Sequence, residues 1–241
     1  MNRQTLLRTT GAVLLLAGVL PAWAGPAPAE PAAPAASAAS AAPAAAAVPA
    51  APGYYAAAQL GRNNLSRWPA RVDFGGVGVD GELGLDRGLH GGVAVGRQTE
   101  HARFELEYQY GRFDISRMTL GPVSEPGSGG GHYQALTVNA YRTAAWTESL
   151  GAYAGVGLGW GAATLPSLRM SNGCNCFAGA DHGGWLYQAR LGLDYRLGPA
   201  HDLFVQYTWL RMPGGSGGEG PTVSYERRHV GAWSVGYRYH F

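Results

Sequence analysis

The sequence predicts an all-β protein: an eight-stranded antiparallel up-and-down β-barrel that spans a membrane. Three observations lead to this prediction. Large apolar residues alternate with small or polar ones in eight segments, which is the period of a half-buried strand. The connections between these segments are alternately long and short. The last segment, "GAWSVGYRYHF", keeps a large apolar residue at every second position up to its end, where polar, frayed sequence is usual.

Residues 1–24 have the features of a secretory signal peptide. Arg3 and Arg8 precede the short apolar run "GAVLLLAGVL", and "AWA" provides a small-x-small cleavage site, so we expect cleavage after Ala24. The alternative, a retained membrane anchor, is disfavoured because the run is too short to span a bilayer. Residues 25–52 are almost wholly Ala, Pro and Ser and predict a flexible or semi-extended linker.

The composition fits a barrel and disfavours a nucleic-acid partner. Only 14% of the residues are charged, 38 are glycine and 11% are aromatic. All 18 basic residues are arginines, and loss of Arg3 and Arg8 with the signal peptide would leave 16 of them against 16 acidic residues. Nucleic-acid binding would require a basic surface, which a chain without net charge does not predict.

Eight strands follow within residues 53–241, each close to the ~9–11 residues that a tilted strand needs to cross a bilayer. They are expected at 54–62, 88–97, 102–113, 133–142, 150–162, 184–198, 202–211 and 231–241. Alternation begins earlier, at Val77, and we interpret its first half as a hairpin that extends beyond the membrane.

The connections indicate which end of the barrel faces outward. Those at 63–87, 114–132, 163–183 and 212–227 are long, whereas the intervening ones are short. Outer-membrane barrels have long external loops and short periplasmic turns, so an even strand count places both barrel ends and the linker in the periplasm. Prolines support these boundaries, because they avoid central strands and all fall in the connections: Pro69, Pro122, Pro126, Pro166, Pro199, Pro213 and Pro221.

The two faces of the strands favour lipid over a soluble core. In the segment 150–162, large apolar residues alternate with glycines, and Tyr and Trp gather near strand ends as in the aromatic girdles of membrane barrels. A soluble sandwich would instead expose a polar face to water. An open sheet edge in hydrocarbon would leave backbone groups unpaired, so the sheet must close.

These segments resemble the small outer-membrane β-barrel families, namely the opacity-protein-like group and the OmpA-type barrel domain. The resemblance lies in "GGVAVGRQTEHARFELEYQYGR", "GAYAGVGLGWG" and the terminal "WSVGYRYHF", and it covers residues 54–241 apart from the loops. It implies that the last strand carries the signal read by the barrel-assembly machinery. The residues that match this signal are Trp233, Val235, Tyr237, Tyr239 and Phe241.

Alternation also directs a set of charged side chains into the barrel. An eight-stranded barrel has an interior just wide enough for side chains, so these charges predict a salt-bridged core. The alternative is a gate in a small pore. The residues are Arg103, Glu105, Glu107, Arg190, Asp194, Arg196 and Arg238.

The third long connection contains both cysteines, in "SNGCNCFAG". Export favours a Cys174–Cys176 disulfide over metal binding together with His182, which lacks the spacing of a zinc site. The chain contains no HExxH motif, and no enzyme, metal or cofactor is expected.

We therefore expect a monomeric, non-enzymatic integral outer-membrane protein that displays four external loops for envelope structure or surface interaction. Its partners would be outer-membrane lipid and lipopolysaccharide, the assembly machinery, and a host or surface ligand bound by the loops. The alternatives are a small porin-like channel and a lipid-modifying barrel enzyme with a Ser/His site at its rim.

Deletion of Phe241 should lower the amount of folded protein in the outer membrane, because the last strand must be recognised and must close the sheet against the first. Heat-modifiable mobility on gels measures the folded fraction. Folded protein at the level of the intact chain would contradict this role of Phe241.

Overall fold

The computed structural model describes residues 52–218 and 221–241, together with every side chain in them except that of His182. The predicted signal peptide, residues 1–24, and nearly all of the predicted linker, residues 25–52, lie outside these ranges.

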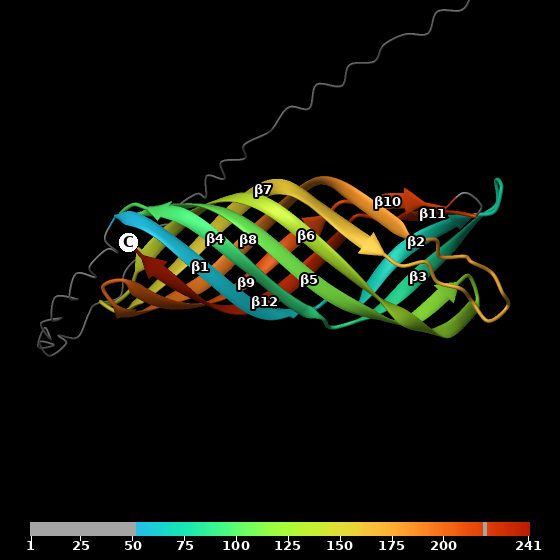
Figure 1. Cartoon of the computed structure of the whole chain (residues 1–241), viewed down its shortest axis with the longest axis horizontal. Helices are drawn as coiled ribbons and strands as arrows, with labels where there is room; N and C mark the ends of the chain where they lie inside the picture. Colours follow the sequence, from blue (N-terminus) through green and yellow to red (C-terminus); the bar gives the residue numbers. More distant parts are fainter. Residues whose placement is uncertain (1–51, 219–220) are drawn as a thin grey trace, which may run out of the picture. The chain divides into compact units, whose positions relative to one another are not determined.

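Eight antiparallel strands form a closed ring, which confirms the predicted fold class (Figure 1). The N-terminal strand β1 pairs with β4 on one side and with the C-terminal strand β12 on the other. Pairing then continues from β4 through the remaining strands in sequence order until it returns to β12. The strands of the ring are β1 (Gly53–Asn63), β4 (Leu89–Gln98), β5 (Ala102–Leu120), β6 (Val123–Ala145), β7 (Leu150–Leu165), β8 (Ala180–Gly198), β9 (His201–Met212) and β12 (Arg228–His240).

The terminal strand closes the ring by pairing with β1 from Ala232 to His240. Its register with β1 runs from Tyr55 opposite His240 to Asn63 opposite Ala232. The backbone N–H of Phe241 adds a hydrogen bond of 3.0 Å to the carbonyl oxygen of Tyr54. The alternating pattern therefore continues to the end of the chain because every residue of this segment lies against a neighbouring strand.

The outward face of the ring is apolar. Each strand presents at least one large aliphatic side chain outward: Leu60, Val93, Leu106, Val138, Val156, Leu191, Val205 and Val235. No helix among the described residues is long and apolar enough to cross a membrane.

Glycines on the inward face allow aromatic rings to lie across the interior. A Cβ atom at Gly192 would lie 2.3 Å from Cζ of Tyr153, and one at Gly155 would lie 2.3 Å from Cδ1 of Tyr141. Real Cβ atoms do not approach so closely, so both positions require glycine as long as the rings stay in place. The inward-facing glycines therefore leave room for the side chains of neighbouring strands.

The long connections are mostly strands, and here the structure corrects the sequence prediction. Strands β5 and β6 continue outward and meet in a turn at residues 121–122, while β2 (Arg67–Asp73) and β3 (Gly78–Asp86) form the expected hairpin extension. Strands β10 (Gly215–Gly217) and β11 (Thr222–Tyr225) join the same sheet. This outer extension lies at the end of the barrel opposite the chain's C-terminus (Figure 1).

Pro69 and Pro126 lie within strands, contrary to the expectation that all prolines fall between them. Pro126 is tolerated because the outer part of β6 pairs with β5 alone, and because the register shifts between Ile115 and Arg117 opposite it. Pro69 lies just beyond the register that β2 shares with β11.

The outer extension encloses an apolar core inside the ring of strands. Trp68, Leu83, Phe113 and Phe177 are almost completely buried there. The same cluster includes Leu65, Val72, Leu85, Ile115, Met118, Leu165, Leu168, Met170, Leu186, Leu210, Met212, Val223, Tyr225 and Val230. The outer extension is thus a folded structure with its own core.

Leu83→Ala should lower the free energy of unfolding by about 2–5 kcal/mol, since it leaves a cavity in this core. The control Val77→Ala removes a side chain that is 66% exposed at the hairpin tip and should change stability by less than about 0.5 kcal/mol. Urea titration of the refolded protein measures both. Equal, small effects would show that the outer extension has no packed core.

Candidate functional site: an ionic lumen capped by a strap

The predicted lumen charges come from three strands of the ring. Arg103, Glu105 and Glu107 alternate along β5, whereas Arg190, Asp194 and Arg196 lie on β8 and Arg238 on β12. Because side chains two residues apart share a face of a strand, each set points to the interior. The structure brings all of them except Arg196 into two groups of ion pairs.

The first group surrounds Arg190. The guanidinium of Arg190 lies 3.7 Å from Glu105 and donates a hydrogen bond to Glu107, and all three side chains are almost completely buried. Glu105 also accepts hydrogen bonds of 2.9 Å from the hydroxyls of Tyr55 and Tyr141. Breaking one partner of such a pair leaves an uncompensated buried charge, so this group strongly constrains the interior.

The second group lies nearer the short turns. Asp194 accepts from Arg238 at 2.9 Å and from Arg103 at 3.4 Å, and Arg238 also reaches Asp202 at 3.4 Å. His240 lies 2.8 Å from the Asp202 carboxylate. Asp202 and His240 were not predicted as members of this group, although His240 has the same alternation as Arg238 and Asp202 follows the turn at its inward position.

Uncharged polar side chains fill the space around the Arg190 group. Gln109 donates to Gln188 at 2.9 Å, and Gln188 donates to Asn139 at 2.6 Å. Asn139 in turn donates to Glu107 at 3.1 Å, so these amides and the carboxylates form one network. Alternation along the sequence places Gln109 and Gln188 on the inward face, but it does not predict the hydrogen-bond network that they form with Asn139.

Arg196 lies outside both groups. Its guanidinium donates to the carbonyl oxygen of Glu148 at 3.4 Å, at the end of the barrel with short turns. There it lines a cavity of about 360 Å³ together with Gln98, Asp194 and Asp202. The lumen is therefore open at the end of the barrel with the short turns, and farther inside it is filled by the ion pairs around Arg190.

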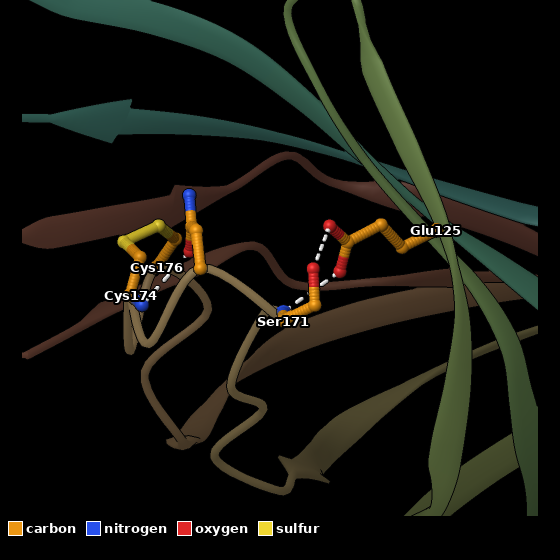
Figure 2. The surroundings of a disulfide bond; sticks show 5 residues. Glu125, Ser171, Cys174 and Cys176 are labelled. Atoms are coloured by element: carbon orange, nitrogen blue, oxygen red, sulfur yellow. Dashed lines mark hydrogen bonds between the residues drawn. A yellow bond between two sulfur atoms is a disulfide. The ribbon is translucent and has the colours of Figure 1, made fainter.

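The apolar core at the other end of the lumen includes buried side chains of residues 166–179, a segment that we call the strap. Cys174 and Cys176 form a disulfide in it (Figure 2). The backbone N–H of Leu168 donates a hydrogen bond of 2.7 Å to the carbonyl oxygen of Phe177. The carboxylate of Glu125 on β6 accepts from the hydroxyl of Ser171 at 2.5 Å and from its backbone N–H at 2.8 Å. The strap thus connects the outer edge of β6 with the apolar core.

The pKa of Glu125 lies below its usual range. The main cause is the hydrogen bond from the Ser171 hydroxyl, and the hydrogen bond from the Ser171 backbone N–H contributes less. The described residues contain no group of three or more side chains that could hold a metal ion, and the side chain of His182 lies outside them.

The residues of the predicted assembly signal all face outward on β12 and at its end. Trp233, Val235 and Phe241 are more than half exposed, and Tyr237 and Tyr239 slightly less so. Tyr207 on β9 packs against Trp233 with ring centres 5.1 Å apart. These side chains are therefore available to lipid or to a protein that binds the strand before it closes the ring.

A closed ring of strands, apolar outside and polar inside, defines an integral β-barrel membrane protein. The family model for the outer membrane protein β-barrel domain matches residues 32–241. The chain therefore belongs to this family and is an integral protein of the outer membrane, as the resemblance predicted.

Solved outer-membrane protein structures match this chain at low sequence identity. OprG from Pseudomonas aeruginosa has a TM-score of 0.61 and 13% identity over 81% of this chain and 98% of its own. Neisserial surface protein A has a TM-score of 0.47 and 16% identity over 78% and 97% of the two chains. The N-terminal barrel domain of Pseudomonas aeruginosa OprF has a TM-score of 0.38 and 14% identity over 78% and 98%. No curated protein matches the chain.

Glu105→Ala should destabilise the barrel by about 3–5 kcal/mol, because it removes a partner of Arg190 and of two buried tyrosine hydroxyls. The control Glu100→Ala changes an exposed carboxylate in a turn and should have little effect. Chemical unfolding of both variants tests this. A Glu105→Ala variant as stable as the control would show that the ion pairs do not support the fold.

The strap should detach from β6 in acid. Because the pKa of Glu125 is depressed in the folded state, its contribution is present above the unfolded pKa and is lost as the pH falls through the lower folded-state pKa. The amide resonance of Ser171 should move with this titration in NMR spectra and should not do so in Glu125→Gln. A titration that persists in Glu125→Gln would assign the change to another group.

Proposed function

We propose that this protein is a non-enzymatic surface-display barrel, in which the membrane ring supports a folded outer extension for envelope structure or surface contact. The observation that carries the proposal is the filled interior. Ion pairs around Arg190 occupy the middle of the ring, and the apolar core around Phe113 and Phe177 occupies the outer part. An interior packed in this way serves stability rather than passage.

The tip of the outer extension supports a role in surface contact. The hairpin between β2 and β3 turns at Gly75 and Gly76, both with positive φ, and the turn is closed by a hydrogen bond of 3.0 Å between Phe74 and Val77. Phe74 is 43% exposed and Val77 is 66% exposed. Apolar side chains held in place at the outermost turn provide a rigid point of contact for a host or environmental surface.

The small channel is the second candidate, since the cavity beside Arg196 opens the lumen part of the way. Transport would require the ion pairs of Arg190 and the apolar core to rearrange. Display of the outer extension requires no chemical reaction, so we propose no catalytic activity.

Protein refolded into planar bilayers should give no steady single-channel current, because buried side chains block the path at two levels. The folded fraction of the same sample, measured by heat-modifiable gel mobility, provides the control for insertion. Large, steady currents from fully folded protein would replace the display proposal with the channel.

A further inference from the structure

The outward wall of β8, β9 and β12 changes character toward its outer end. Leu191, Leu193 and Val205 cover its middle and are exposed as lipid-facing residues should be. Tyr187 and Trp209 follow farther out. Aromatic residues at this position mark the level of the lipid headgroups.

A row of polar and aromatic side chains around one arginine lies at this level. Tyr187 on β8, Arg211 on β9 and His229 on β12 are direct cross-strand neighbours. Arg211 donates a hydrogen bond of 2.6 Å to the Tyr187 hydroxyl, and its guanidinium carbon lies 5.6 Å from the centre of that ring. His229 stacks on Trp209 with ring centres 4.4 Å apart. We call these four residues the Arg211 cluster.

Arg211 makes no ion pair with any carboxylate among the described residues, in contrast to Arg103, Arg190 and Arg238 of the lumen. One of its N–H groups is bonded to the Tyr187 hydroxyl, which fixes the plane of the guanidinium, and its remaining N–H donors meet no carboxylate among the described residues. A fixed guanidinium without an acidic partner matches the planar, bidentate geometry of phosphate.

The same combination occurs a second time on the other side of the ring. Arg112 on β5 donates to the Tyr110 hydroxyl at 3.2 Å and lies over that ring at 5.6 Å. His132 on β6 is the cross-strand neighbour of Arg112 and stacks on Tyr110 at 5.6 Å. Arg112 likewise has no carboxylate partner in the described part of the chain.

We propose that the Arg211 cluster, and with it the Arg112 group, binds the phosphate groups of a phosphorylated glycolipid in the outer leaflet. The aromatic rings contact the sugar and the upper acyl chains, and the guanidinium pairs with a phosphate oxygen. A soluble phosphate offers the same chemistry, but the cluster continues directly from the lipid-facing wall, which favours a lipid as the source. This proposal does not depend on the proposed display function.

The test compares lipopolysaccharide binding by the full chain in phosphatidylethanolamine nanodiscs. Arg211→Gln should weaken binding of labelled lipopolysaccharide about tenfold, as expected for loss of a charge-assisted pair. Arg112→Gln should weaken it as well. Arg97 on β4 provides a matched control, since its guanidinium lies 5.7 Å from the centre of the Tyr54 ring on β1, at the end of the barrel with the short turns. Binding by Arg97→Gln should remain within about twofold of the unchanged chain.

Two further arms identify the ligand. The affinity of the unchanged chain for dephosphorylated lipopolysaccharide should be no higher than the affinity of Arg211→Gln for the phosphorylated form. Inorganic phosphate at millimolar concentration should not compete with lipopolysaccharide for binding. Equal binding by Arg211→Gln and the unchanged chain, with both folded by gel mobility, would overturn the site. Full displacement by inorganic phosphate would overturn a lipid as its ligand.

Discussion

The buried guanidinium of Arg190 is the interaction on which the rest of the interior depends. A cation placed inside a ring of strands whose outer face contacts lipid is costly unless carboxylates and hydrogen-bond acceptors surround it. Glu105 and Glu107 supply the carboxylates, and their remaining oxygens are occupied by tyrosine, glutamine and asparagine side chains. Satisfying one charge therefore determines the side chains on several neighbouring strands.

This requirement explains the division of the interior into layers. Around Arg190 the lumen is polar, and toward the short turns a second set of ion pairs surrounds Asp194. Toward the outside the interior becomes apolar, because the strands continue beyond the membrane and enclose a core that the strap covers. The outer half is thus held together by apolar burial and the membrane half by charge pairing.

Much of this could be predicted from alternation. It placed the strands, directed Arg103, Glu105 and Arg238 inward, and accounted for the pattern of the last strand. It missed the outer parts of β5 and β6, because "VSEPGSGGG" has no apolar alternation of its own and is held as a strand by its pairing with β5. Asp202 was missed for another reason, since its ion pair forms only when β9 lies beside β12 in the closed ring.

A double-mutant cycle on Arg190 and Glu107 tests the central claim most directly. Unfolding free energies of Arg190→Met, Glu107→Gln and the double variant give the coupling between the two side chains. We expect strongly non-additive effects, with a coupling of about 2–3 kcal/mol and a double variant more stable than the sum of the single changes implies. Additive effects within about 0.5 kcal/mol would contradict it, because they would mean that the charges do not depend on each other.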